Sequence, residues 1–405
     1  MRATGGGVFH GVWGRLFGSA LLFWSGLTLL LPTLPLYLAE VVGASDGQIG
    51  WVIGAFALGM LLFREPVGRW TDSQGRKRGI QLGLLVLATA PWGYLCWRQI
   101  PVLFVLRAYH GLSVAAFATA YLALVTDLAP PAQRGRILGY MTLAQPVGVA
   151  LGPAIGGYLA EQGQYSLLFG LSALLGTLSW ALCTWGVQEP PRRLSEPVPS
   201  LSWGLLLTPR LRTPALVFLL VGLLFGGLQI FIPLFIKRQG LPLNPGLFYT
   251  AVAAASFSVR LLLGRVADRW GRGRWITTSL GCYCLAMLTL GSRPGVPGLL
   301  LAAVLEGMGA GLLIPGMAAL IADRSTLHER GRSFGLCLGG FDLGIALAGP
   351  LVGRGLEVLG LQGVTTVSFG IAVTALTVHL LGMGKNPRDS LAFALANGPD
   401  AYRVS

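Results

Sequence analysis

Long apolar runs recur along the whole chain and are separated by short polar loops. A bilayer core of about 30 Å needs about 20 apolar residues per helix. Strands of a membrane barrel would be shorter and would alternate apolar with polar residues. The runs therefore predict an all-α membrane protein with twelve transmembrane helices, at residues 15–38, 48–67, 79–97, 101–126, 137–160, 166–187, 214–236, 244–267, 275–291, 296–321, 333–356 and 362–383.

The composition agrees with this pattern. Of the 405 residues, 53% are hydrophobic and 11% are charged, whereas soluble domains carry about 25% charged residues. This excludes a soluble enzyme and a disordered chain. The five cysteines fall inside predicted helices, without the spacing of a metal site. No P-loop, HExxH motif or nucleophile elbow occurs, so we expect no enzyme activity, no cofactor and no metal.

The charge balance is strongly basic, with 30 Lys and Arg against 16 Asp and Glu and a net charge of +14. In a soluble protein this excess would suggest a nucleic-acid partner. With the N-terminus inside, however, most basic residues fall in alternating loops on one membrane face. The positive-inside rule then predicts a multi-pass protein of the plasma (inner) membrane with both termini in the cytoplasm. The excess of basic residues therefore requires no nucleic acid.

The sequence contains an internal repeat at an offset of 196 residues. Polar landmarks coincide at this offset along about 70 residues, in the pairs Arg64 and Arg260, Gly68 and Gly264, Asp72 and Asp268, Arg76 and Arg272, Gly111 and Gly307, Asp127 and Asp323, Arg134 and Arg330, and Arg136 and Arg332. The repeat predicts two homologous halves of six helices each.

The repeat also sets the expected domain boundaries. The first half is residues 1–187 and the second is residues 214–384. Between them, residues 188–213 are rich in Pro, Arg and Ser and read as a cytoplasmic linker. Residues 385–405 read as a cytoplasmic tail.

The loop after the second predicted helix carries the most specific motif. The segment GRWTDSQGRKR, Gly68–Arg78, resembles the signature G-x-x-x-D-x-x-G-R-[KR] of the major facilitator superfamily. A second copy, GRVADRWGRGR, occupies Gly264–Arg274. The resemblance covers nearly the whole chain. It implies the major facilitator fold, with twelve helices in two pseudo-symmetric six-helix bundles, and a secondary transporter that works by alternating access.

The same motif predicts a cytoplasmic gate. Gly68 would let a neighbouring helix approach, Gly75 would turn the chain, and Asp72 and Arg76 could pair at the membrane surface. We expect the duplicated charges to form an ionic latch that holds the outward-open state. The expected gate residues are Gly68, Asp72, Gly75, Arg76, Asp127, Arg134 and Arg136, with Gly264, Asp268, Gly271, Arg272, Asp323, Arg330 and Arg332 in the second half.

Two further motifs narrow the resemblance to the drug and metabolite:proton antiporters. The segment RAYHG, Arg107–Gly111, resembles the R-x-x-x-G motif that the superfamily associates with proton coupling. In the predicted helix 137–160, a stripe of small residues resembles the antiporter motif. We expect this helix to pack against the opposite half along its glycines at 148, 152 and 156. The residues of this motif are Gly148, Gly152, Pro153, Gly156 and Gly157.

Ionisable residues inside the membrane need a partner, a cavity or a function. At the repeat offset, His110 in the predicted helix 101–126 corresponds to Glu306 in the predicted helix 296–321, and the resemblance places these helices around the central cavity. Many drug exporters carry a carboxylate in their first helix, but the predicted helix 15–38 has none. We therefore expect Glu306 to carry the proton, with Arg107 and His110 as modulators. A static Glu306–Arg107 pair is the alternative. The remaining polar candidates for the cavity are Asp342, Gln145 and Gln229.

These features favour proton-coupled efflux of small, moderately hydrophobic compounds. The expected partners are a small-molecule substrate, protons and the lipid bilayer, and the expected state is a monomer. An importer or facilitator of sugars or organic anions is one alternative. The predicted helices that would line its cavity offer few hydrogen-bonding side chains for a sugar, and they are residues 15–38, 101–126, 214–236 and 296–321. A non-transporting membrane sensor is the other.

Overall fold

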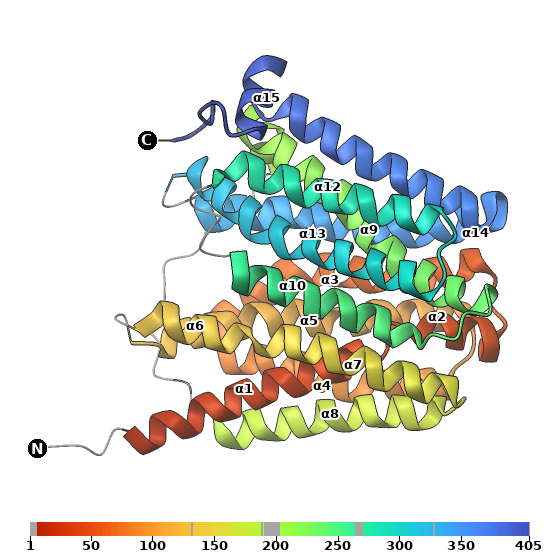
Figure 1. The fold of residues 1–405 in the computed structure, drawn as a ribbon. Coiled ribbons are helices and arrows are strands. Elements are labelled where there is room, and N and C mark those ends of the chain that lie inside the picture. Colours follow the sequence, from red (N-terminus) through yellow and green to blue (C-terminus); the bar gives the residue numbers. More distant parts are fainter. Residues whose placement is uncertain are drawn as a thin grey trace, which may run out of the picture. The chain divides into compact units, whose positions relative to one another are not determined.

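The structure is a computed structural model that describes residues 6–130, 133–187, 189, 203–263, 270–326 and 329–404. These residues are mostly helical, with short turns and loops between the helices, and contain no strand (Figure 1). Contacts divide the chain into two compact units. Unit 1 consists of Met1–Pro197 and Asn244–Thr250, and unit 2 consists of Val198–Leu243 and Ala251–Ser405.

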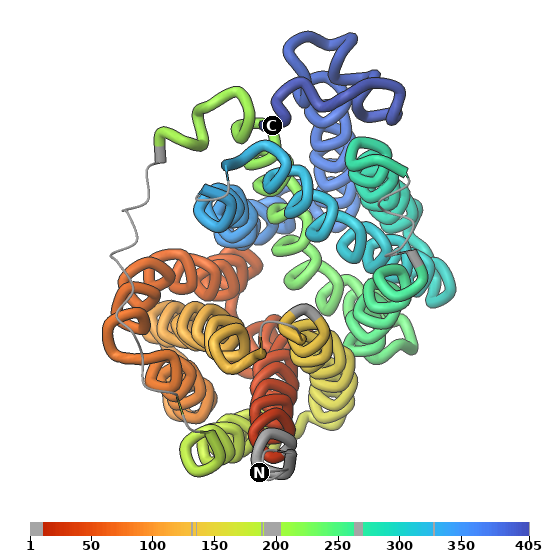
Figure 2. Tube along the Cα trace, turned by 90° about the vertical axis from the view of Figure 1, so that its left-hand side faces the viewer, coloured from red at the N-terminus to blue at the C-terminus, as the bar shows by residue number. Residues whose placement is uncertain are grey.

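Unit 1 is built from the helices of the first half of the sequence. In chain order they are α1 (Gly6–Thr28), α2 (Leu34–Tyr37), the short π-helix Leu38–Val42, α3 (Asp46–Gln74), α4 (Arg76–Cys96), α5 (Ile100–Leu128), α6 (Arg134–Thr142), α7 (Ala144–Glu161) and α8 (Tyr165–Gly186). Helix α1 packs against both α7 and α8. Figure 2 shows this arrangement, with α1 in red between the two.

Unit 2 contains the helices of the second half. They are the 3-10 helix Trp203–Leu207, α9 (Pro209–Arg238), α10 (Pro245–Leu263), α12 (Arg272–Gly291), α13 (Val296–Asp323), α14 (Arg330–Gly382) and α15 (Pro387–Ala394). The first residues of α10 cluster with unit 1. Within unit 2, α9 packs along α14, and α12 packs against α13 and α14.

The helices account for the twelve predicted spans. Among the described residues, nine helices are long and apolar enough to cross a membrane. One of them, α14, has 53 residues and contains Gly360 with non-helical backbone angles (φ 67°), so it comprises two spans. Helix α12 contains the predicted span 275–291. Helix α1 overlaps the predicted span 15–38 but ends at Thr28, and the last residues of that span form α2 and the start of the π-helix. The chain is a multi-pass membrane protein with the predicted all-α fold.

Local sequence explains where several helices begin and end. Helix α3 begins with a capping box, in which the Ser45 side chain accepts from the Gln48 backbone and the Gln48 side chain accepts from the Ser45 backbone. This satisfies amides that have no partner within the helix. Helix α3 ends at Gln74 and is followed by Gly75, whose φ of 112° is accessible to glycine but not to most other residues. Helix α4 starts at the next residue.

Aromatic and aliphatic side chains fill the interior of unit 1. Phe23 of α1 stacks on Phe117 of α5, with ring centroids 3.9 Å apart. Leu84 of α4 and Cys183 of α8 are fully buried in the same cluster. In unit 2, the indole nitrogen of Trp275 on α12 donates to the Leu312 carbonyl of α13 at 2.9 Å. This packing fixes the helices that carry the candidate site.

Candidate functional site: two charged loops and buried ionisable residues

The first charged loop lies where α3 ends and α4 begins. Arg76 forms an ion pair with Asp72, one helical turn before it. Its Nε also lies 3.6 Å from Oδ2 of Asp127, at the end of α5. The Arg76 side chain is 18% exposed, whereas both carboxylates are more than 40% exposed. One guanidinium therefore joins the ends of three helices within unit 1.

Glu189 adds an anion to this loop. Its carboxylate accepts from the backbone N–H of Arg76 at 2.7 Å and of Lys77 at 3.0 Å. These amides open α4, where the helix has unpaired donors and a partial positive charge. A Cβ at Gly75 would lie 2.8 Å from Oε2 of Glu189. Glycine at this position therefore leaves room for the carboxylate.

The second charged loop repeats one part of the first. Nε of Arg272 lies 3.4 Å from Oδ2 of Asp323, and these residues correspond to Arg76 and Asp127 at the repeat offset. Gly271 has a φ of 79°, as the turn before α12 requires. The predicted gate residues Gly264 and Asp268 lie outside the described residues. The arginine–aspartate pair is thus present in both units.

Among the described residues, no ion pair involves the other predicted gate arginines. Arg134 and Arg136 are exposed at the start of α6, and Arg136 lies over the Tyr140 ring. Arg330 is exposed and Arg332 is half-buried at the start of α14. A Cβ at Gly68 would meet no atom of its own unit within 4 Å. No helix of unit 1 approaches Gly68 closely among the described residues, so the expected close approach at this glycine stays a prediction.

Arg107 and His110 form a buried cluster on α5. They are 5% and 0% exposed, and Nη1 of Arg107 lies 3.4 Å from Nδ1 of His110. The Tyr94 hydroxyl lies 3.2 Å from the same imidazole nitrogen. The guanidinium carbon of Arg107 sits 4.4 Å from the centre of the Phe56 ring, a cation–π contact. An aromatic face and an imidazole thus surround this buried charge.

The glycine of the R-x-x-x-G motif has a packing role. A Cβ at Gly111 would lie 2.1 Å from the Phe56 carbonyl oxygen of α3. At the equivalent position in unit 2, a Cβ at Gly307 would lie 2.3 Å from the Val252 carbonyl oxygen of α10. Both glycines let two helix backbones touch, which larger residues would prevent. His110 and Glu306 each directly precede one of these contacts.

Glu306 is buried on α13, with 2% of its surface exposed. Its Oε1 has no hydrogen-bond partner among the described residues. A buried carboxylate oxygen without a donor is costly when it is charged. Such an atom is suited to binding a proton.

The remaining cavity candidates differ in exposure. Asp342 on α14 is 3% exposed, Gln229 on α9 is half-buried, and Gln145 near the start of α7 is exposed. Asp342 and Gln229 belong to unit 2 with Glu306, whereas Gln145 belongs to unit 1 with Arg107 and His110.

The glycine stripe on α7 packs against α1 of the same unit. A Cβ at Gly148 would lie 2.6 Å from Cβ of Trp24. One at Gly152 would lie 2.2 Å from Oγ1 of Thr28, and one at Gly156 would lie 2.2 Å from the Leu29 carbonyl. The prediction that these glycines face the opposite half is therefore wrong. The stripe lets α1 and α7 come into backbone contact instead.

The end of the same motif meets the segment Asn244–Thr250. A Cβ at Gly157 would lie 1.9 Å from Oδ1 of Asn244. The Asn244 side chain donates to the Ala154 carbonyl at 3.4 Å, and Thr250 Oγ1 donates to the Ala150 carbonyl at 2.8 Å. These contacts explain why this segment clusters with unit 1.

The sequence profile of the Major Facilitator Superfamily matches residues 16–292 and 245–399. The chain belongs to the Major Facilitator Superfamily. Solved structures of the same fold include a bacterial homolog to the human lysosomal transporter Spinster, with 16% identity, a TM-score of 0.71 and coverage of 99% of both chains. The nucleoside transporter NupG matches with 12% identity and a TM-score of 0.76, over 90% of this chain and 97% of that one.

Among curated proteins, the quinolone resistance protein NorA of Staphylococcus aureus (strain MRSA252) is 26% identical over 211 residues, which is 50% of this chain and 54% of NorA. Multidrug resistance protein 1 of Bacillus subtilis (strain 168) is 31% identical over 167 residues, 41% of this chain and 42% of that protein. The chain thus matches about half the length of these superfamily members.

Several residues of the site have no signal in the sequence. Tyr94 and Phe56 contact the Arg107–His110 pair, and Glu189 closes the first charged loop. Glu189 lies 113 residues from Arg76 along the chain, and the repeat offset places Lys385 rather than an acid opposite it. Only the fold brings these residues together.

Proposed function

We propose that the chain exports small, moderately hydrophobic compounds in exchange for protons, by alternating access of its two halves. In this proposal Glu306 carries the proton, and Arg107 and His110 modulate its affinity. The observation that carries the proposal is the position of Glu306. It is 2% exposed in an apolar helix, with one carboxylate oxygen that accepts no hydrogen bond from a described residue.

The comparisons support the efflux part of the proposal. Two curated relatives are named for resistance to quinolones or to multiple drugs, which points to export of compounds of this kind. The proposed membrane orientation, with both termini in the cytoplasm, follows from the distribution of basic residues. It puts both charged loops on the cytoplasmic side.

The charged loops supply the proposed gate. Exposed ion pairs contribute only about 0–1 kcal/mol each. Arg76 pairs with Asp72 and Asp127, and Arg272 pairs with Asp323. In this proposal the pairs act together on one conformational equilibrium. A few kcal/mol is enough to change which conformation dominates. We infer that these networks stabilise the outward-open state.

Transport by purified protein tests the proposal. The protein is reconstituted into liposomes, a pH gradient is imposed, and uptake of a quinolone and of hydrophobic dyes is followed together with internal pH. The proposal predicts accumulation that depends on the gradient and disappears when a protonophore collapses it. Uptake that is indifferent to the gradient would contradict proton coupling. Absence of transport for the whole panel, with uptake of a sugar or organic anion, would support the importer alternative.

A further inference from the structure

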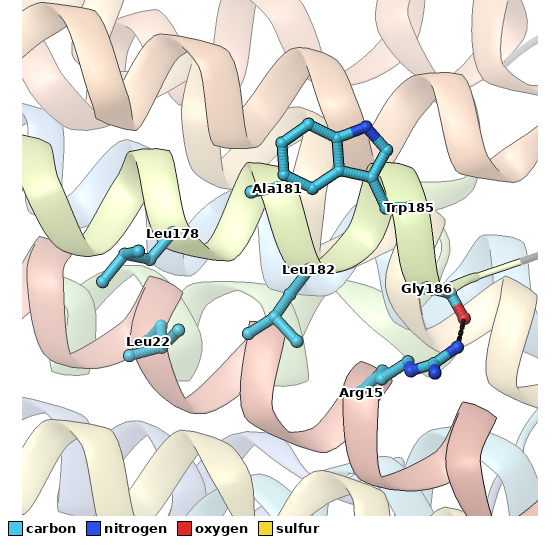
Figure 3. A pocket seen from close by; sticks show the side chains of 7 residues that line it. All are labelled: Arg15, Leu22, Leu178, Ala181, Leu182, Trp185 and Gly186. Atoms are coloured by element: carbon cyan, nitrogen blue, oxygen red, sulfur yellow. Dashed lines mark hydrogen bonds between the residues drawn. The ribbon is translucent and has the colours of Figure 1, made fainter.

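A pocket on the surface of unit 1 lies between α1 and α8 (Figure 3). Its volume is about 410 Å³. Its walls are apolar, with Leu22 from α1 and Leu178 and Leu182 from α8. Leu178 is 46% exposed, so the pocket opens to the outside of the helix bundle. In a transmembrane protein, this surface faces lipid chains.

One end of the pocket is cationic. Arg15 of α1 is exposed, and its Nη1 donates to the Gly186 carbonyl at 3.2 Å. Beside it, Trp185 is 82% exposed. Lys77 supplies a second cation at the same end of α8, where its Nζ donates to the Thr184 carbonyl at 2.8 Å. Figure 3 shows Arg15 and Trp185 at the same end of the groove, with the leucines towards the other.

We propose that this groove binds an anionic phospholipid, with an acyl chain along Leu22 and Leu182 and the phosphate group at the Arg15 guanidinium. The apolar walls require an apolar occupant, and an exposed guanidinium favours a phosphate. A phospholipid joins both groups in one molecule. Tryptophan is enriched at the level of the head groups, as Trp185 would be here.

The membrane orientation strengthens the charge argument. With the N-terminus in the cytoplasm, Arg15 and the end of α8 lie in the cytoplasmic leaflet. Anionic lipids give this leaflet its negative surface potential. The inference uses the proposed topology but not proton coupling or drug efflux, so it can hold even when the proposed transport activity does not.

A simpler role for Arg15 must be separated from lipid binding. Arg15 also covers a carbonyl in the last turn of α8, which stabilises the helix end in any lipid. A residue that only caps α8 would give no preference between an anionic and a zwitterionic head group. Head-group preference is therefore the discriminating readout.

Fluorescence quenching at Trp185 measures that preference. The full chain is placed in phosphatidylcholine nanodiscs that contain a minor fraction of brominated phosphatidylglycerol or brominated phosphatidylcholine. Because the chain has 11 tryptophans, the Trp185 signal is taken as the difference from Trp185→Phe. We expect about fivefold stronger binding of the anionic lipid, which corresponds to about 1 kcal/mol for one basic residue at an anionic surface.

Three variants, each with its own Trp185→Phe reference, complete the test. Arg15→Gln should abolish the preference, and Arg15→Lys should keep it because the charge remains. Arg78→Gln, an exposed arginine on α4 that bonds to Gln74, should leave it unchanged. Equal quenching by the two lipids in the unmodified chain would overturn the proposal. So would a preference that survives in Arg15→Gln.

Discussion

Arg324 and Asp400 form a buried ion pair that ties the C-terminal tail to unit 2. Nη2 of Arg324 lies 2.8 Å from Oδ1 of Asp400, and its Nε lies 2.9 Å from Oδ2. The Arg324 side chain is fully buried. It also donates to the carbonyls of Arg210 and Met383. One guanidinium thus joins the start of α9 and the ends of α13 and α14 to the tail.

Removing Asp400 should destabilise unit 2. Breaking a buried ion pair from one side costs about 3–5 kcal/mol, because the other charge stays buried without its partner. Asp400→Ala should lower the melting temperature of the detergent-solubilised protein. Unfolding is monitored by the reaction of a thiol dye with Cys337, which is buried in the folded protein. Asp389→Ala, at an exposed position on α15, is the matched control. Equal melting temperatures for the two variants would show that the pair adds no stability.

The glycine stripe on α7 predicts a folding defect. Gly152→Ala places a Cβ 2.2 Å from Oγ1 of Thr28 and 2.6 Å from the Ser25 carbonyl, so α1 must move away. Overpacking of this kind costs about 1–3 kcal/mol. We expect a lower melting temperature and weaker protection of α1 in hydrogen exchange. Gly170→Ala on α8, where a Cβ meets nothing within 4 Å, should behave like the unmodified chain. Identical protection of α1 in both variants would refute the backbone contact.

Glu189 should stabilise the first turn of α4. A carboxylate at a helix N-terminus typically contributes about 0.3–1 kcal/mol, and here it also accepts two amide hydrogen bonds. Glu189→Ala should speed amide exchange of residues 76 and 77 by about two- to fivefold, measured by hydrogen-exchange mass spectrometry. Exchange in the first turn of α12, which Glu189 does not contact, should not change. If α4 exchanges at the original rate, the capping role is wrong.

The gate proposal predicts a change in the conformational equilibrium. Asp72→Asn removes one partner of Arg76 and should favour the inward-open state. The measurement is labelling of single cysteines placed near the cytoplasmic and the outer ends of the helices, with more cytoplasmic labelling expected. Glu65→Gln breaks another i,i+4 ion pair on the same helix, with Arg69, and should leave the labelling as it was. A shift of equal size in both variants would mean that Asp72 has no special role.

The fold could be predicted from the sequence because its main cause is local. Twenty apolar residues in a row can lie in a membrane only as a helix. The constant offset between Asp127 and Asp323 also predicts equivalent residues in both halves, and the Arg76–Asp127 and Arg272–Asp323 pairs lie at equivalent positions.

The partners of these residues could not be predicted in the same way. A stripe of glycines such as Gly148 and Gly152 indicates that a helix is approached closely, but not which helix approaches. Asp400 lies 76 residues from Arg324, and the repeat offset places Leu128 opposite that arginine. No pattern in the sequence therefore indicated the buried pair, because both its partners and its burial depend on tertiary packing.

The most direct test of the central claim is proton-coupled transport by Glu306→Gln in liposomes. Glutamine resembles the protonated carboxyl in shape but cannot release a proton. The account predicts that this variant still binds substrate but loses transport driven by a pH gradient, and keeps at most downhill exchange. Glu357→Gln, which alters an ion pair with Arg354, should transport normally. Full proton-coupled transport by Glu306→Gln would contradict the account and would move the role to Asp342 or remove proton coupling altogether.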